Sequence, residues 1–297
     1  MTGDVMQMSG KTVLVTGSTG GIGKETAREL ARLGARVILV GRDTERAEAA
    51  ATEIGATACT GDLTTLDRVR RLADEIADRH PRLHVLVNNA GGMSASRTLT
   101  QDGVERTFAL NVLAPYALTC RLVPQLRAAE GARVVNLTGG IPGKPLDVAN
   151  LQGEKKYLGW TFSQYNHAKT ALMAVSRRMA DALAPDDITV NVAYPGHAYT
   201  PGNKATSISA FPYAYRPVAP LIHFFGPRLL NDLAKAARSS VHLAASPELD
   251  GITDAYFNAQ LRRVPWPAGA RDEQTATTVQ HLCENLSGLT LHSPRTL

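Results

Sequence analysis

Residues 13–23 read VLVTGSTGGIG, in which a short apolar run precedes a turn that carries Gly17, Gly21 and Gly23. Glycine lets a backbone turn tightly and approach another group closely, because it has no Cβ. The residues after the turn have the period of a helix as far as Leu33, and Gly34 ends that helix. The spacing differs from G-x-G-x-x-G, but the strand–turn–helix context predicts the same site for a dinucleotide pyrophosphate.

Apolar runs of strand length alternate with helical periods along most of the chain. Their β-branched residues run continuously, which is typical of parallel strands covered on both faces. We therefore predict one α/β domain over residues 1–297, a doubly wound parallel sheet of the Rossmann type with about seven strands and helices on both faces. Strands are expected at 13–15, 37–40, 57–60, 83–87, 133–137, 188–192 and near 255–257, and helices at 22–33, 45–54, 66–80, 104–126 and 164–183.

The segment 200–233 breaks this alternation. It is rich in proline and aromatic residues, so we expect an insertion that covers the substrate at the open end of the sheet. The other interpretation is an ordinary connection with small helices.

The composition narrows the class of protein. The 297 residues carry a formal charge of +5 with scattered basic residues, which favours a solvated surface over a nucleic-acid site. Three distant cysteines fit a reducing compartment without disulfides, and the histidines lack the spacing of metal ligands. Prolines and charges interrupt residues 211–230, the longest apolar-looking stretch. We therefore expect a cytoplasmic protein that has no metal and no integral membrane segment and acts on a small molecule.

Residues 165–169 read YNHAK and place Tyr165 and Lys169 on one face of a predicted helix. A free tyrosine has a pKa of about 10, which is too high for easy proton exchange near neutrality. A nearby ammonium lowers that pKa by stabilising the phenolate. Tyr165 is thus the expected general acid in reduction and base in oxidation, and Lys169 is expected to serve both the phenol and the nicotinamide ribose. With the phosphate turn, the pair indicates an enzyme that moves a hydride and a proton together.

The second strand ends in Gly41-Arg42-Asp43. A guanidinium at this place favours the 2′-phosphate of NADP, so we expect NADP(H) over NAD(H). Asp43 argues the other way if its carboxylate faces the ribose. Arg42 has a second interpretation, as a surface arginine paired with a helix acid.

The turn and the Tyr–Lys pair together resemble the short-chain dehydrogenase/reductase family, over nearly the whole chain. TGSTGGIG is similar to its cofactor turn, Gly61-Asp62-Leu63 to its adenine-contacting acid and Asn88-Asn89-Ala90-Gly91 to its NNAG element. Asn111 resembles a helix asparagine that holds a water for proton relay to Lys169, and Tyr194-Pro195-Gly196 resembles the turn beside the nicotinamide. The resemblance implies that these residues bind the cofactor: Gly17, Ser18, Thr19, Gly21, Ile22, Gly23, Arg42, Asp62, Leu63, Asn89, Ala90, Gly91, Tyr165, Lys169, Pro195, Gly196 and Thr200.

Three longer stretches resemble the retinol dehydrogenase-like branch of this family. They cover residues 21–43, 150–157 and 239–257. The branch implies NADP-preferring carbonyl reductases and alcohol dehydrogenases that act on bulky apolar substrates. Its membrane-anchored members carry an N-terminal hydrophobic helix, and we expect none in this chain. The resemblance also implies a homodimer or homotetramer that assembles through the helices at 104–126 and 164–183.

One position departs from the family pattern. Residues 134–140 read VVNLTGG, which puts Gly139 where the catalytic serine is usual and Thr138 one residue earlier, pointing the opposite way on an extended chain. Losing one such donor costs roughly two to four kcal/mol of transition-state stabilisation. Thr138 can swing in, Ser163 or His197 can reach the oxygen, or the substrate can carry its own neighbouring hydroxyl, as a polyketide-like ketone would. Our catalytic set is Tyr165, Lys169, Asn111 and Thr138.

The sequence thus predicts an NADP(H)-dependent ketoreductase or alcohol dehydrogenase for a bulky apolar or aromatic carbonyl, in secondary metabolism. One alternative is a redox-neutral cyclase, epimerase or dehydratase on the same fold, suggested by the missing serine. The other is a non-catalytic NADP-binding sensor, against which the intact Tyr165, Lys169 and Asn111 argue. Stoichiometric NADPH consumption separates the first function from both others.

Overall fold

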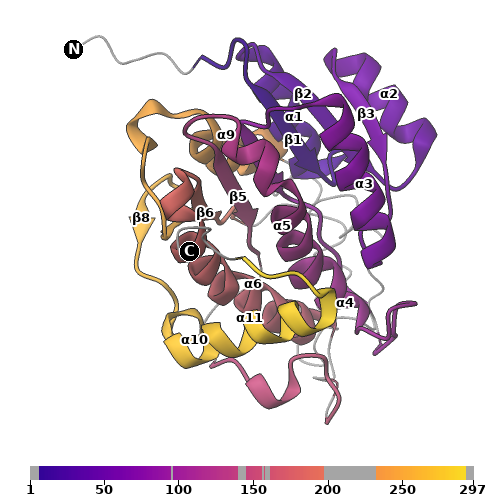
Figure 1. The fold of residues 1–297 in the computed structure, drawn as a ribbon, viewed down its shortest axis with the longest axis vertical. Helices are drawn as coiled ribbons and strands as arrows, with labels where there is room; N and C mark the ends of the chain where they lie inside the picture. Colours follow the sequence, from indigo (N-terminus) through magenta and orange to yellow (C-terminus); the bar gives the residue numbers. More distant parts are fainter. Residues whose placement is uncertain are drawn as a thin grey trace.

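The computed structural model describes residues 7–94, 96–139, 145–155, 157, 161–196 and 232–291, except the side chains of 161–163. They build one sheet in the order β3-β2-β1-β4-β5-β6-β7-β8 (Figure 1). Seven strands run parallel and β8 pairs antiparallel with β7. The strands are β1 (Thr12–Thr16), β2 (Arg36–Gly41), β3 (Thr57–Thr60), β4 (Val85–Asn88), β5 (Arg133–Leu137), β6 (Thr189–Ala193), β7 (Ala255–Phe257) and β8 (Arg263–Val264). The predicted doubly wound sheet is confirmed. The strand β8 was not predicted, because two residues are too few to show a strand pattern in the sequence.

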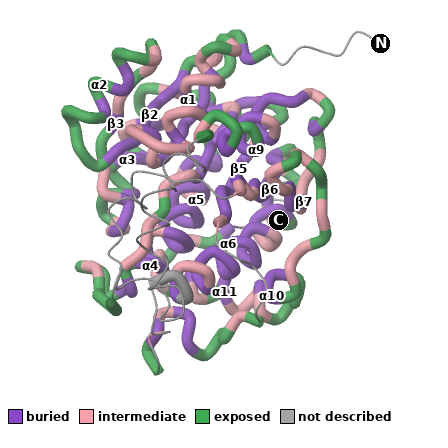
Figure 2. The backbone as a smooth tube through the Cα atoms, turned by 180° about the vertical axis from the view of Figure 1, so that it is seen from behind, coloured by how far each residue is buried: buried purple, intermediate pink, exposed green. Residues whose placement is uncertain are grey.

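Helices cover both faces of the sheet. One face packs against α1 (Gly21–Arg32), α2 (Thr44–Ile54) and α9 (Leu233–Ala245), and the other against α3 (Leu66–Arg79), α5 (Ala114–Arg127) and α6 (Thr161–Leu183). Alternate strand residues enter the two cores: Val13 and Val15 face α1 and α9, whereas Leu14 faces the α5 side. In Figure 2 the strands, α5 and α6 are mostly buried while the outer turns of α2 and α3 are exposed.

Two helices near the C-terminus were not predicted. Asp232 caps α9 by accepting from the Lys235 N–H, and the Thr26 and Ser240 hydroxyls, 2.7 Å apart, join α9 to α1. The second, α11 (Glu273–Ser287), follows the short α10 (Ala268–Arg271) and packs on α6 and α5. The buried side of α11 is made mostly of small residues, so the sequence shows only a weak helical pattern of apolar residues there. α11 covers part of the two helices that the resemblance assigned to subunit contacts.

The predicted helix at 104–126 is divided into three parts. α4 (Arg106–Phe108) leads into a π-helical turn, η1 (Ala109–Leu113), and then into α5. The buried Glu105 begins it, because its carboxylate accepts from the N–H groups of Thr107 and Phe108 at 2.8 Å. Short 3-10 turns lie at η2 (Val148–Asn150), η3 (Ala184–Asp186) and η6 (Pro247–Leu249).

A buried chain of polar side chains fixes the carboxyl ends of β4 and β5. The Asn88 side-chain amide donates to Oδ1 of Asn136 at 2.8 Å, and the Asn136 Nδ2 donates to the Ser176 hydroxyl of α6 at 2.8 Å. Asn88 also donates to Thr119 of α5 at 3.3 Å. Because all four side chains are buried, these bonds set the distance of both helices from the sheet edge.

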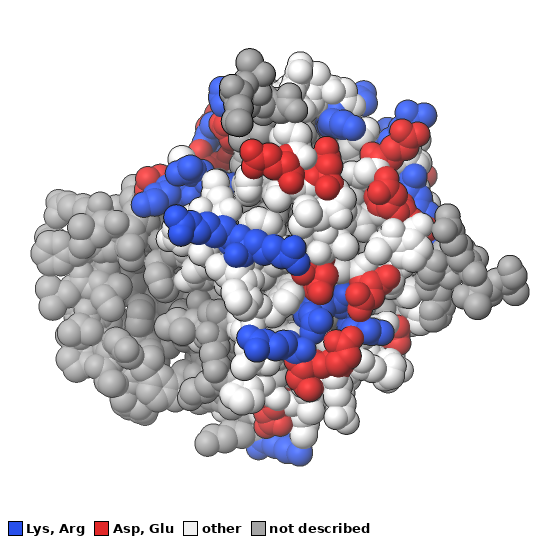
Figure 3. Space-filling view, turned by 90° about the vertical axis from the view of Figure 1, so that its left-hand side faces the viewer, with Lys and Arg blue, Asp and Glu red and all other residues white. Residues whose placement is uncertain are grey.

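The surface of the described residues mixes both charges. On the face shown in Figure 3, basic and acidic side chains are interspersed. On α3, Arg70 pairs with Asp67 and Asp74. None of the described helices combines the length and apolar character that crossing a bilayer requires. The expected covering segment, 200–233, lies outside the described residues apart from Asp232 and Leu233.

Candidate active site

The glycine-rich turn joins β1 to α1 at the carboxyl edge of the sheet. Gly17 and Gly21 have φ of +64° and +60°, a conformation that side chains disfavour. α1 begins at Gly21 without a side-chain cap on Gly20 and without an acidic residue in its first turn. Its first N–H groups and positive dipole end therefore suit an anion, as a dinucleotide pyrophosphate is.

The glycines of this turn also pack against the segment after β4. A Cβ on Gly23 would overlap the Asn89 amide and lie 2.5 Å from the Gly17 carbonyl oxygen. A Cβ on Gly17 would lie 2.8 Å from the Ala90 Cα. Asn89 in turn donates to the carbonyls of Thr16 and Gly17 at 2.8 and 3.0 Å. The two motifs thus form one cradle, which fits a dinucleotide at the switch point between β1 and β4.

Ser18 holds the turn from within. Its buried hydroxyl donates to the Val15 carbonyl at 2.7 Å and accepts from the Val40 N–H at 3.0 Å. The Thr19 methyl contacts the position where Gly41 lacks a Cβ. The Ser18 side chain is therefore used to join the turn to β2. The other expected cofactor residues follow strand carboxyl ends in the same way: Ile22 after β1, Asp62 and Leu63 after β3, Pro195 and Gly196 after β6.

Arg42 and Asp43 lie at the end of β2 in different settings. The Asp43 carboxylate accepts from the Arg46 N–H at 2.9 Å and caps α2. Arg42 is exposed and makes no ion pair with the described residues. The carboxylate that argued for NAD is thus engaged with a helix, and the proposed pairing of Arg42 with a helix acid is not found among the described residues.

α6 brings Tyr165 and Lys169 to the end of β5. The buried Lys169 Nζ donates to the Leu137 carbonyl at 2.9 Å and lies 5.8 Å from the centre of the Tyr165 ring. A Cβ on Gly91 would lie 3.2 Å from Lys169 Nζ and 2.8 Å from Asn111 Oδ1. The predicted residues of three separate motifs therefore meet in one cluster beside the dinucleotide cradle.

Asn111 lies on the π-helical turn η1, an element that is frequent at functional sites. Its amide donates to the carbonyls of Gly92 and Thr107 at 2.7 and 2.8 Å, and its Oδ1 accepts from the Gly92 N–H at 3.3 Å. Asn111 thus holds the segment after β4 against the helix, a structural role that the sequence did not indicate.

Burial sets the protonation of the Tyr–Lys pair. It lowers the pKa of Lys169 to about 7, because the described side chains bring no carboxylate close to the ammonium. It raises the pKa of Tyr165 to about 12, and the neighbouring Tyr194 phenol adds to that rise. The Tyr–Lys spacing predicted that Lys169 lowers the pKa of Tyr165. In the protein alone desolvation outweighs that effect, since a lysine near its own pKa is only partly charged.

Gly139 lies directly against the Tyr165 phenol. A Cβ at residue 139 would lie 2.6 Å from the Tyr165 Oη and 3.5 Å from its Cζ. Real Cβ atoms do not approach an oxygen this closely, so any side chain here requires the phenol to move. We predicted that the missing side chain at Gly139 leaves room for a wide substrate ring. At this point the Tyr165 phenol fills that room.

Thr138 follows β5 and is only 3% exposed. Its N–H donates to the Ala193 carbonyl at 3.0 Å. Its buried hydroxyl has no hydrogen-bond partner among the described residues, which is costly unless another group satisfies it. The other two replacements named for the missing serine, the Ser163 side chain and His197, lie outside the described residues, as does Thr200.

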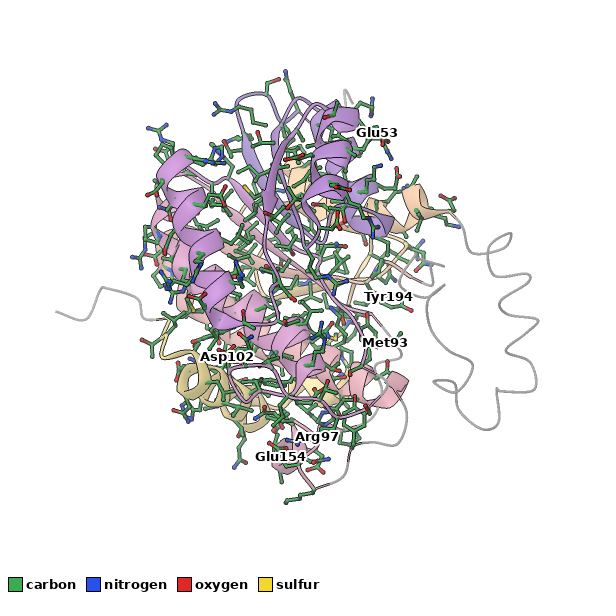
Figure 4. All side chains as sticks on the ribbon, turned by 90° about the vertical axis from the view of Figure 1, so that its right-hand side faces the viewer. Glu53, Met93, Arg97, Asp102, Glu154 and Tyr194 are labelled. Atoms are coloured by element: carbon green, nitrogen blue, oxygen red, sulfur yellow. The ribbon has the colours of Figure 1, made fainter. Side chains whose placement is uncertain are left out.

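Two loops form a rim beside this cluster. The Tyr157 hydroxyl donates to the Ser94 carbonyl at 2.9 Å, and Arg97 Nε donates to the Gln152 carbonyl at 3.0 Å. Figure 4 shows Arg97 and Glu154 together at this rim. The segment after β4 is thereby joined to the segment before α6. These contacts were missed because no spacing in the sequence relates two loops that are so far apart along the chain.

The chain is similar to known oxidoreductases over most of its length. The short chain dehydrogenase family model matches residues 11–209. Human retinol dehydrogenase 13 is 32% identical, and the match covers 96% of this chain and 87% of that protein. A Streptomyces sp. (strain C5) protein assigned as the daunorubicin C-13 ketoreductase DnrU is 34% identical over 84% of each chain.

Solved structures share the fold. An uncharacterised protein from Mycobacterium paratuberculosis superposes with a TM-score of 0.76 at 28% identity, over 97% of this chain and 98% of that one. RhlG of Pseudomonas aeruginosa, solved with NADP in its active site, gives a TM-score of 0.65 at 28% identity, over 85% and 95% of the two chains.

Lys169→Met should stabilise the cofactor-free protein at low pH. Lysine has a pKa of about 10.4 when unfolded and about 7 here, so between these values the unfolded chain binds more protons and stability rises with pH. The destabilisation by Lys169 is therefore complete below pH 7 and absent above about 10.4. Melting temperatures at pH 6 and pH 9.5 should show a larger gain for the variant at pH 6. The exposed Lys235→Met is the control, and a gain independent of pH would contradict the assignment.

Gly139→Ala should destabilise the protein by about 1–3 kcal/mol, as overpacking does, because its Cβ meets the Tyr165 hydroxyl. The same substitution in a Tyr165→Phe background should cost much less, since the nearest atom is then absent. Urea unfolding of the four proteins measures both costs. Equal costs in the two backgrounds would show that the hydroxyl is not the obstacle.

Proposed function

Because the chain belongs to the short-chain dehydrogenase/reductase family, in its retinol dehydrogenase-like branch, we propose that it is an NADP(H)-dependent ketoreductase or alcohol dehydrogenase for a bulky apolar or aromatic carbonyl. Membership supports an oxidoreductase acting between an alcohol and a carbonyl. The observation that carries the proposal is the cluster of Tyr165, Lys169 and Asn111 at the end of β5, beside the dinucleotide cradle.

In this proposal the bound dinucleotide supplies or accepts the hydride, and the residues handle the proton. The raised pKa of the half-buried Tyr165 keeps the proton on Oη until an alkoxide forms on the substrate. Lys169, held by the Leu137 carbonyl, lowers the phenol pKa once it is charged. Asn111 fixes the segment after β4, and Thr138 is kept as a candidate for the second hydrogen bond to the carbonyl oxygen.

The preference for NADP(H) rests on the end of β2. Arg42 is exposed and has no ion-pair partner among the described residues, whereas the Asp43 carboxylate caps α2. A free guanidinium beside the adenine ribose would bind a 2′-phosphate. RhlG, a relative by structure, is described with NADP in its active site, which supports the same choice.

The substrate class rests on the relatives' names. Retinol is a long apolar alcohol, and the name of the Streptomyces relative assigns it to the C-13 ketone of daunorubicin. A bulky aromatic ketone, a role in secondary metabolism and a cytoplasmic location are therefore part of the proposal. So is one domain over residues 1–297 with a covering segment at 200–233. A homodimer or homotetramer would have to use the parts of α5 and α6 that α11 leaves uncovered.

The missing side chain at Gly139 keeps a redox-neutral reaction as the second candidate, and an NADP-binding sensor as the third. Incubation of NADPH with an aromatic ketone such as 2-acetylnaphthalene separates them. The proposal requires one NADPH consumed per alcohol formed. A second incubation uses a β-hydroxy aromatic ketone, which can also lose water. Dehydrated product formed from it without NADPH loss would favour the redox-neutral enzyme, and tight NADPH binding without product from either ketone would favour the sensor.

Tyr165→Phe should reduce turnover by at least on the order of a hundredfold, the usual contribution of a positioned general acid. NADPH affinity should stay close to that of the unchanged protein, because only the hydroxyl is lost. Steady-state rates and calorimetric titration of NADPH measure both. Tyr116→Phe, which removes a buried phenol that donates to Leu289 away from the site, is the control. A Tyr165→Phe variant of near full activity would place the acid elsewhere.

Arg42→Ala should weaken NADPH binding by on the order of tenfold or more, the worth of a charge-assisted hydrogen bond. NADH binding should change little, because NADH has no 2′-phosphate. Arg46→Ala removes an exposed neighbouring charge on α2 and should leave the preference intact. Calorimetry with both cofactors decides, and equal losses, or tighter NADH binding by the unmodified protein, would refute the NADP assignment.

A further inference from the structure

The site lacks one hydroxyl, and residue 139 cannot supply it. The Tyr165 Oη lies 2.6 Å from the place of a Cβ on Gly139, so the phenol has taken the space in which that hydroxyl would be carried. Thr138 is the nearest hydroxyl in sequence, but its oxygen is buried within the protein. A substrate oxygen can reach it only if the backbone moves. Among the described residues, a second donor would have to be fixed nearby and still partly accessible.

The pairing of β5 with β6 brings Tyr194 to this place. Leu137 pairs with Ala193, and the Thr138 N–H continues the ladder to the Ala193 carbonyl. Tyr194 is thus the neighbour of Thr138 on the adjoining strand, about 4.8 Å away along the sheet. The phenol is long enough to extend past the strand end from there, whereas the threonine hydroxyl is not.

Tyr194 faces the same helix as Tyr165. Side chains alternate along a strand, so Tyr194 shares a face with Val192, which packs with Met173 and Ala174 of α6. Tyr194 packs on this same cluster. The backbone of Tyr194 is fixed to β7, because its N–H donates to the Phe257 carbonyl at 2.8 Å. The ring therefore projects from a fixed base toward the helix that carries Tyr165 and Lys169.

The Tyr194 ring is close to the Tyr165 phenol and remains partly accessible. Tyr194 packs with Tyr256 on the cluster at Met173 of α6, and its phenol adds to the rise in the pKa of both Tyr165 and Tyr256, so it lies near each of them. It is half-buried, unlike Thr138. In Figure 4 Tyr194 lies on the same flank of the molecule as Met93, which follows the NNAG segment.

We propose that Tyr194 is a further catalytic residue, whose hydroxyl donates the second hydrogen bond to the carbonyl oxygen that Tyr165 protonates. This inference rests on the proposed function and names the donor that replaces the missing serine. The step is a hydride added to the carbonyl carbon and a proton moved from Tyr165 to the oxygen. Tyr194 keeps its own proton and stabilises the negative charge that develops on that oxygen.

Tyr194→Phe tests the proposal because it keeps the ring and removes only the hydroxyl. We expect kcat for 2-acetylnaphthalene to fall by on the order of a hundredfold, with the NADPH dissociation constant unchanged. Tyr256→Phe is the matched control: it removes a phenol from the same cluster, where its ring stacks on Trp266 at 5.7 Å, and should leave kcat unchanged. An unchanged kcat in Tyr194→Phe, or a loss confined to NADPH affinity, would overturn the proposal, as would a greater loss of kcat in Thr138→Val.

A second ketone separates a chemical role from a structural one. In 1-hydroxy-2-acetylnaphthalene the neighbouring hydroxyl already donates to the carbonyl oxygen. The loss caused by Tyr194→Phe should therefore be much smaller with this ketone than with 2-acetylnaphthalene, whereas a packing defect would slow both equally. Equal losses with the two ketones would thus also overturn the proposal.

Binding of 2-acetylnaphthalene to the NADP⁺ complex gives a readout that does not need turnover. Tyr194→Phe should weaken it about fivefold, which corresponds to about 1 kcal/mol for one hydrogen bond. If the unmodified protein binds the ketone but never consumes NADPH, the proposed function fails while weaker binding by Tyr194→Phe still supports the hydrogen bond. Equal affinities of the variant and the unmodified protein would refute it.

Discussion

The hydrogen bond from Lys169 to the Leu137 carbonyl is the interaction on which the site depends, because it joins α6 to the last residue of β5. Lys169 lies next to Gly91 and Asn111, so the same ammonium also contacts the segment that follows β4. The buried hydrogen bonds that join Asn88, Asn136 and Ser176 also hold β4, β5 and α6 together. Moving any of the three elements would separate the phenol from the dinucleotide cradle.

Lys169 is buried and Tyr165 is half-buried at this junction, and desolvation controls where the proton lies. Desolvation raises the pKa of Tyr165 and lowers that of Lys169, so each group in the protein alone prefers its neutral form. A further charge beside the lysine would therefore change the protonation of both groups. The same desolvation makes Lys169 a source of instability, which the protein tolerates because the surrounding hydrogen bonds hold the site together.

Glycine has two different uses at this edge of the sheet. Gly17, Gly23 and Gly91 lack side chains because neighbouring protein groups lie where a Cβ would be, which lets three motifs pack into one cradle. Gly139 lacks one because the Tyr165 hydroxyl lies there. The absence of a side chain at Gly139 is therefore coupled to the position of Tyr165. Tyr194 at the adjoining strand end is half-buried, unlike Thr138.

The sequence by itself determined the parallel sheet, the turn at residues 16–23 and the Tyr165–Lys169 pair, because these depend on local period and spacing along one element. It did not show that Asp43 caps α2, that the Tyr165 hydroxyl lies against Gly139, or that Tyr194 is the strand neighbour of Thr138. It also missed α9 and α11, whose buried sides are made of small residues. Only the tertiary structure decided these points, since strand register and helix packing bring together residues that no spacing in the chain relates.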